Sequence, residues 1–204
     1  MSSFSAASAF VLTAIFAPAA LSAAPCPTVS DLDTGIILER TDPLFRETIR
    51  SGAAGLIAER DMDRDGTVMQ VQSIFGHALA ITRRRDARSD LTIEYSADLQ
   101  QLDRLDQIKT LRSKTTLRIN GGAPISGHTM WQFVDQTKFE IGGCTYDTWV
   151  VIETPAYDGR VSSRFQQFYA PEPGLILASV KLDPSGKPIS GVTFNILRRA
   201  EETP

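Results

Sequence analysis

Hydrophobic and polar side chains alternate along much of the chain after residue 25. Residues 91–95 read Leu-Thr-Ile-Glu-Tyr, with every odd position apolar. The same period of two recurs in residues 115–120, 176–182 and 192–196. Successive side chains of a strand point to opposite faces, so this period predicts strands with one buried face.

Short turn sequences separate these apolar runs. Dipeptides such as Asp-Gly and Gly-Gly provide the backbone geometry of tight hairpins. They occur at 65–66, 121–122, 142–143 and 158–159. The spacing predicts a mainly β, single-domain antiparallel meander of about ten strands, forming a curved sheet or half-barrel.

A short internal echo lies near the start of the sheet. Residues 35–40 (Gly-Ile-Ile-Leu-Glu-Arg) return as residues 55–60 (Gly-Leu-Ile-Ala-Glu-Arg). The spacing fits two like-directed strands with a third between them, with chance similarity as the alternative. Periodicity favours a strand for residues 44–50, while Asp42 before a proline leaves a capped helix open as the alternative.

One segment has helical spacing. Within residues 98–109, leucine or isoleucine occupies every third position from Leu99 to Ile108, and Asp98 with Gln101 resembles a capping box. We expect one short helix that covers an opening of the sheet.

The first 24 residues have the pattern of a signal peptide. They contain no charged side chain, and the apolar run at 9–17 is followed by small residues at 20–24. The run is shorter than the roughly 20 residues of a membrane-spanning helix. We therefore expect cleavage after residue 23 or 24, a single periplasmic domain over residues 25–204, and no transmembrane span after cleavage.

Two cysteines remain in the expected mature chain. Cys26 and Cys144 form an even pair in a protein that is expected to be exported, and neither has a second cysteine or a histidine at metal-ligand spacing. We predict a disulfide that ties the N-terminus to the sheet. Pro25 stands where a lipoprotein processing site requires a small residue, which argues against lipidation of Cys26.

Asp61, Asp63, Asp65 and Gly66 match the opening of a calcium-binding EF-hand loop. The twelfth position of such a loop is a bidentate glutamate, but here it is Gln72, and the following residues alternate like a strand. A hairpin tip with solvated carboxylates is the favoured interpretation. A calcium-stabilised structural module is the alternative, and no metal site is predicted.

The three consecutive arginines at 83–85, together with Arg88, form the basic cluster of the sequence. Asp86 and Asp90 interrupt the cluster, so a charged hairpin turn is the favoured interpretation. Contact with an anion or a lipid head group is the alternative.

The chain carries little recognisable catalytic chemistry. His77 alternates with apolar residues and is expected in the core, whereas His128 lies in a Gly/Pro-rich stretch near Ser126 and Asp135, which leaves a hydrolase as an alternative. Nucleotide-binding, zinc and serine-hydrolase motifs are absent from the sequence. No catalytic residue and no cofactor are predicted.

Charge excludes one class of partner. The 204 residues carry a formal charge of -3 and the pI is about 5.4, whereas nucleic-acid binders carry clustered excess cations. We therefore expect no nucleic-acid partner.

Aromatic residues are the candidates for ligand contact. On residues 144–153, Tyr146, Val150 and Ile152 make the more apolar face, which leaves Trp149 on the opposite, mixed face. A large aromatic residue there indicates either a covering element, which is favoured, or an apolar groove.

Residues 139–177 resemble the closing hairpins of bacterial periplasmic β half-barrel proteins of the lipoprotein-carrier-like superfamily. The likeness is carried by Ile141-Gly-Gly-Cys-Thr-Tyr146, Tyr157-Asp-Gly159 and Tyr169-Ala-Pro-Glu-Pro-Gly-Leu175. It implies a curved sheet around an apolar concavity that binds lipid-like chains, with Trp149, Phe165 and Tyr169 as lining residues.

These observations together predict a non-enzymatic, exported binding or envelope-maintenance module. Its partner would be an apolar small molecule or lipid held on the concave face of the sheet, or another envelope protein. We expect that face to be apolar and without organised charge.

Overall fold

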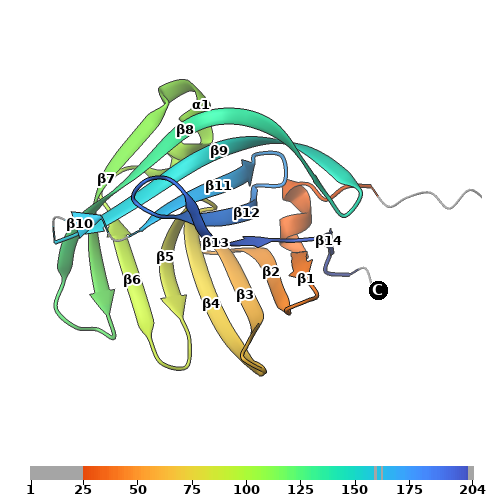
Figure 1. Cartoon of the computed structure of the whole chain (residues 1–204), viewed down its shortest axis with the longest axis horizontal. Helices are drawn as coiled ribbons and strands as arrows, with labels where there is room; N and C mark the ends of the chain where they lie inside the picture. Colours follow the sequence, from red (N-terminus) through yellow and green to blue (C-terminus); the bar gives the residue numbers. More distant parts are fainter. Residues whose placement is uncertain (1–24, 159, 162, 202–204) are drawn as a thin grey trace, which may run out of the picture.

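The computed structural model describes residues 25–158, 160–161 and 163–201, so the predicted signal peptide lies outside the described residues. The described chain is mainly β, as predicted, and its strands form one antiparallel sheet of fourteen strands rather than about ten (Figure 1). The strands are β1 Ile36–Arg40, β2 Phe45–Gly52, β3 Gly55–Arg64, β4 Thr67–His77, β5 Ala80–Arg85, β6 Asp90–Tyr95, β7 Thr110–Ile119, β8 Ile125–Ile141, β9 Cys144–Tyr157, β10 Arg160–Val161, β11 Arg164–Ala170, β12 Leu175–Leu182, β13 Pro188–Thr193 and β14 Ile196–Arg199.

The sheet is an open meander whose two edge strands are consecutive in the chain. Neighbours along the sheet are β13-β12-β11-β9-β8-β7-β6-β5-β4-β3-β2-β1-β14, and β10 pairs with β9 beside this path. The chain passes from one edge strand, β13, to the other, β14, through Phe194 and Asn195 alone. Since consecutive Cα atoms are about 3.8 Å apart, the two edges approach each other at this crossing, and the sheet is rolled around an interior. In Figure 1 the β8–β9 hairpin arches over the wall formed by β2 to β6.

The first three strands confirm the interpretation of the echo. β1 and β3 both run antiparallel to β2, so they are like-directed, and residues 45–52 are strand rather than helix. Gly35 directly precedes β1 and has a φ of 111°, and Gly55 is the first residue of β3 and has a φ of 114°. Both glycines therefore hold a positive φ that other residues rarely adopt.

The predicted covering helix is present in two parts. A 3-10 helix, η2, spans Leu99–Arg104 and continues into α1, Leu105–Ile108. The Asp98 side chain accepts a hydrogen bond from the Gln100 amide at 3.0 Å. Repetition of leucine at every third position suits the three residues per turn of a 3-10 helix, and Leu102 and Leu105 are fully buried against the sheet.

The N-terminal segment is fixed to the sheet by a disulfide and by several polar contacts. The predicted bond between Cys26 and Cys144 is present. The Tyr146 hydroxyl donates to the Pro27 carbonyl at 2.8 Å, and Arg199 pairs with Asp31 of the short 3-10 helix η1, Val29–Asp33, at 2.7 Å. None of the helices in the described ranges is long and apolar enough to cross a membrane.

Two regions differ from the predicted strand boundaries. The Gly/Pro-rich stretch around His128 is part of the 17-residue strand β8, where a side chain at Gly127 would collide with the backbone of Ala156. Residues 192–196 are not one strand, because the chain leaves one edge of the sheet at Thr193 and joins the other at Ile196. A sequence period cannot reveal that crossing.

Candidate functional site: a cavity inside the rolled sheet

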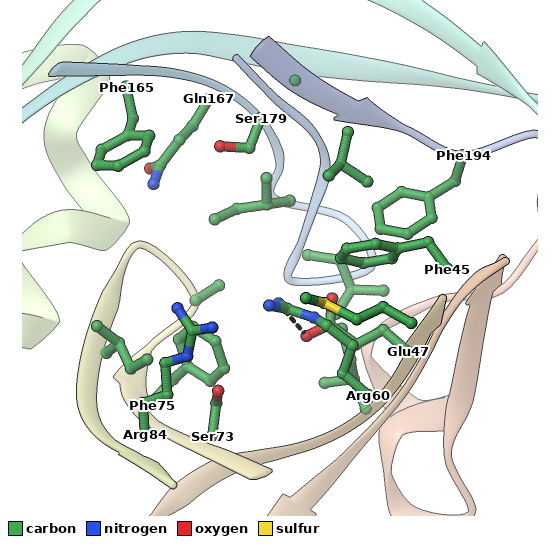
Figure 2. Close-up of a pocket in the computed structure, with 18 of the residues that line it drawn as sticks. Phe45, Glu47, Arg60, Ser73, Phe75, Arg84, Phe165, Gln167, Ser179 and Phe194 are labelled. Carbon is green, nitrogen blue, oxygen red and sulfur yellow. Dashed lines mark hydrogen bonds and ion pairs between the residues drawn. The ribbon is translucent and has the colours of Figure 1, made fainter. Parts of the chain in front are cut away.

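The interior of the rolled sheet holds a cavity of about 640 Å³ (Figure 2). It is lined from β2 to β5 on one side and from β9 and β11 to β13 on the other. The cavity therefore lies on the concave face. Its apolar lining includes Phe45, Phe75, Phe165, Phe194, Ile49, Leu56, Leu175 and Ile176.

Alternation explains which side chains of β2 and β4, and most of those of β3, line the cavity. The register pairs Phe45 with Met62 and Glu47 with Arg60, and all four side chains line the cavity. Strand β4 continues the same face with Ser73 and Phe75. The inward face of these strands is thus mainly apolar and carries polar or charged side chains such as Glu47, Arg60 and Ser73.

A β-bulge decides which arginine of the basic cluster faces inward. Phe75 pairs with Ile81 but Ile74 pairs with Arg83, so Thr82 is the extra residue on β5. The Thr82 hydroxyl donates to the Ile74 carbonyl at 3.1 Å. Beyond the bulge Arg84 faces the cavity, whereas Arg83 is 44% exposed and pairs with Asp90 at 2.6 Å.

Arg60 is held in place by its neighbours on β2. Its Nη2 donates to Glu47 Oε1 at 2.7 Å, and its guanidinium carbon lies 4.9 Å from the centre of the Phe45 ring. The Nε atom of Arg60 is buried without a hydrogen-bond partner among the described residues. Arg60 therefore has a fixed position and an unused donor.

Arg84 is a half-buried cation whose charge is poorly compensated. Across the described residues no hydrogen bond or ion pair to its guanidinium is found. Burial, and then the nearby charge of Arg60, lower the pKa of Arg84, with Asp86 and Glu47 acting in the opposite direction. Arginine remains protonated at any physiological pH, so the site holds a lasting positive charge.

The opposite wall of the cavity presents acceptors. Gln167 Nε2 donates to Glu153 Oε2 at 2.8 Å, and Gln167 Oε1 is buried without a partner among the described residues. Burial raises the pKa of Glu153 to about 7, while the hydrogen bond from Gln167 acts to lower it. Figure 2 shows Gln167 and Phe165 across the cavity from Arg84.

The three aromatic residues expected to contact a ligand occupy two different environments. Phe165 lines the cavity. Trp149 and Tyr169 instead pack against each other, with ring centres 5.6 Å apart, in a buried cluster that includes Leu102 and Leu105 of the covering helix. For Trp149 the covering element is thus the interpretation that the structure supports.

The more apolar face of β9 was predicted incorrectly beyond residue 148. Trp149 and Val151 are buried, whereas Val150 and Ile152 are only half-buried. Tyr146 is also buried, on the other face of the strand, because the N-terminal segment packs against it. Both faces of β9 are therefore covered, in different parts of its length.

The other sequence candidates lie away from the cavity or at its rim. Asp65 is at the tip of the β3–β4 hairpin, as favoured, and Asp61 and Asp63 lie on the strand β3. Across the described ranges no group of three or more acidic, cysteine or histidine side chains could hold a metal ion.

The two histidines lie in different parts of the molecule and do not form a common site. His128 is exposed on β8, opposite Lys114 and Ala156. His77 is largely buried, contacts Asp103 at 3.2 Å and stacks near Tyr169. Burial lowers the pKa of His77, with Asp103 opposing the change.

The expectation of a concave face without organised charge is wrong. Glu47, Arg60, Arg84 and Glu153 all line the cavity. The sequence did indicate inward-facing charge at the Glu47–Arg60 pair, since Glu47 shares an apolar strand face with Phe45 and Ile49. Arg84 was hidden by the bulge, because simple alternation from Ile81 points Arg83 inward.

A scan against protein-family models and searches of curated proteins and of solved structures found no match.

Proposed function

We propose that this chain is an exported, non-enzymatic binding protein that holds a lipid-like ligand in the cavity of its rolled sheet. The observation that carries the proposal is the cavity itself, about 640 Å³ in volume and lined by four phenylalanines and several aliphatic side chains. Ligand sites of proteins commonly measure about 300–1,000 Å³ and are mostly apolar.

The energetics favour an apolar chain as the occupant. Burial of apolar surface yields about 25 cal/mol per Å². Phe45 and Phe194 already pack edge to face at 5.6 Å, so the aromatic wall on that side is well ordered. A preformed wall binds with little cost of side-chain ordering.

Export is supported by the sequence and by the disulfide. The first 24 residues have the pattern of a signal peptide, and the bond between Cys26 and Cys144 is of a kind that persists in oxidising compartments such as the periplasm. The resemblance of residues 139–177 to lipoprotein-carrier-like half-barrels points in the same direction, toward the periplasm and a lipid-like ligand.

Ligand occupancy can be tested with a neutral fluorescent probe. N-phenyl-1-naphthylamine should gain fluorescence on binding to the purified protein, and native mass spectrometry of protein from the exporting compartment should show a bound apolar mass. Ser179 lines the cavity, so Ser179→Trp should fill it and lower probe affinity at least tenfold. Thr193→Trp, at an exposed position on the adjacent strand, is the matched control. Absence of probe binding by the wild-type protein, together with clean spectra, would rule the proposal out.

A further inference from the structure

The cavity is lined by more positive than negative side chains, although the chain as a whole has a formal charge of -3. Its cationic lining residues are Arg40, Arg60, Arg64, Arg84 and Lys181, and its acidic ones are Glu47, Asp63 and Glu153. Glu47 is already paired with Arg60. The excess charge deep in the lining is that of Arg84.

Arg60 and Arg84 point into the same space from strands β3 and β5. Figure 2 shows both guanidinium groups extending into the cavity, with Arg60 tied to Glu47. Their separation is short enough for the charge of Arg60 to disfavour that of Arg84. Two like charges that converge are an unfavourable arrangement. Glu47 and Asp86 compensate it in part, and an added acid group would relieve it further.

The structure assigns an anionic amphiphile to this cavity: a molecule with one acid group held between the guanidinium groups of Arg84 and Arg60, and an apolar chain along the phenylalanines. The inference rests on the proposed function and specifies its ligand class.

The geometry of the donors fits an acid group. Arginine presents a planar fork of N–H donors that matches carboxylate and phosphate oxygens, and such charge-assisted bonds are about twice as strong as neutral ones. Arg60 is pre-positioned by Glu47 and the Phe45 ring, so little order has to be gained when the anion binds.

The acceptor wall fixes the orientation of the ligand. Glu153 and Gln167 present oxygen atoms from β9 and β11, and the hydrogen bond between them leaves Gln167 Oε1 unpaired. Oxygen acceptors repel an acid group, so the head group is directed to the arginine wall and the chain to the phenylalanines. A cationic amphiphile is disfavoured, because the lining carries more positive than negative side chains.

The test compares ligands that share one chain and differ in the head group. Dodecanoate, dodecyl phosphate, dodecanol and dodecylammonium, each below its micelle concentration, are titrated against the probe-loaded, disulfide-bonded protein. The anions should displace N-phenyl-1-naphthylamine at least tenfold more tightly than dodecanol, and dodecylammonium should be the weakest. The tighter of the two anions identifies a carboxylate or a phosphate head group.

Two neighbouring arginines provide the matched variants. Arg84→Gln should weaken anion binding about tenfold and leave dodecanol binding unchanged, which also shows that the variant folds. Arg84→Lys should restore part of the loss. Arg83→Gln, one residue away but on the outer face and paired with Asp90, should leave both affinities unchanged.

Two results would overturn the inference: equal affinities for dodecanoate, dodecyl phosphate and dodecanol, or equal effects of Arg84→Gln and Arg83→Gln. Either result leaves the proposed function standing, because the neutral ligand still binds. Failure of every amphiphile and of the probe would instead remove the proposed function.

Discussion

The interior of the rolled sheet is filled in one part and hollow in another. Near the covering helix, Trp131 and Trp149 join Leu102 and Leu105 in a cluster of buried side chains. Beyond Leu79, which borders both parts, phenylalanines surround a cavity of about 640 Å³. The same curved sheet thus carries a packed core and an unfilled one side by side.

The difference separates stability from binding. The filled part gains free energy from close packing. The hollow part leaves apolar surface uncovered and the guanidinium of Arg84 without a partner among the described residues. Behind the hollow part lies a second buried cluster that includes Ile49, Leu175 and Cys144, and this cluster is cross-linked by the disulfide. Substitutions should therefore have different consequences in the two parts.

The largest effect is expected from the filled part. Trp131 is fully buried and its Nε1 donates to the Leu79 carbonyl at 2.8 Å. Trp131→Ala should lower the free energy of unfolding by about 5 kcal/mol, because it leaves a large void and an unpaired carbonyl. Urea unfolding followed by circular dichroism measures the change. A loss below about 2 kcal/mol would show that this part is not the packed core of the molecule.

Removal of the disulfide should have the next largest effect. Cys26 and Cys144 are 118 residues apart, and a cross-link of that span restricts the unfolded chain strongly. The double variant Cys26→Ser/Cys144→Ser should be about 4 kcal/mol less stable in urea. Probe affinity should fall as well, since the cross-linked cluster supports the wall of the cavity at Ile49 and Leu175.

Wild-type protein in reducing buffer should reproduce the behaviour of the double variant. If reduced wild type and the double variant both unfold at the same urea concentration as oxidised wild type, the cross-link does not stabilise the hollow part.

The half-buried carboxyl group of Glu153, which lines the hollow part, should make stability depend on pH. The pKa of Glu153 is raised from 4.5 to about 7. Between these two pH values the folded state therefore retains a proton that the unfolded state releases. Stability from this group is complete below pH 4.5 and is lost as the pH rises through 7, by at most about 3 kcal/mol at 1.36 kcal/mol per pH unit.

Glu153→Gln should remove this loss. The variant should match wild type near pH 4 and exceed it by up to about 3 kcal/mol at pH 8, measured by urea unfolding across the range. Glu59→Gln is the control, since Glu59 is 51% exposed and pairs with Arg50. A difference between Glu153→Gln and wild type that does not grow with pH would show that the carboxyl ionises as freely as in water.

The contrast between the two parts also explains how much was predictable. Alternation identified the mainly β fold. The strand expected at residues 44–50, the covering helix and the disulfide followed from local patterns. These features depend on residues near in sequence or on a count of two cysteines. They define the sheet but not its interior.

The cavity could not be predicted in the same way. The bulge at Thr82 turns Arg84 inward, and a second bulge after Phe133 leaves Val134 exposed on β8. Each bulge reverses the phase of one strand, so the facing of later residues cannot be read from a constant period. Which side chains fill the interior depends on strands that are distant in sequence, such as β5 and β11.

The smallest effect on stability is expected at the aromatic residue that was predicted as a ligand contact and does line the cavity. Phe165 is half-buried at the hollow part, so Phe165→Ala should cost under about 1 kcal/mol in urea, far less than Trp131→Ala, because little packing is lost. The affinity of the Phe165→Ala variant for N-phenyl-1-naphthylamine should nevertheless fall about fivefold, since the ring supplies apolar contact surface. Phe165→Leu should recover most of that affinity. A stability loss as large as that of a fully buried aromatic residue, with unchanged probe binding, would mean that Phe165 belongs to the packed core and that the division between the two parts is wrong.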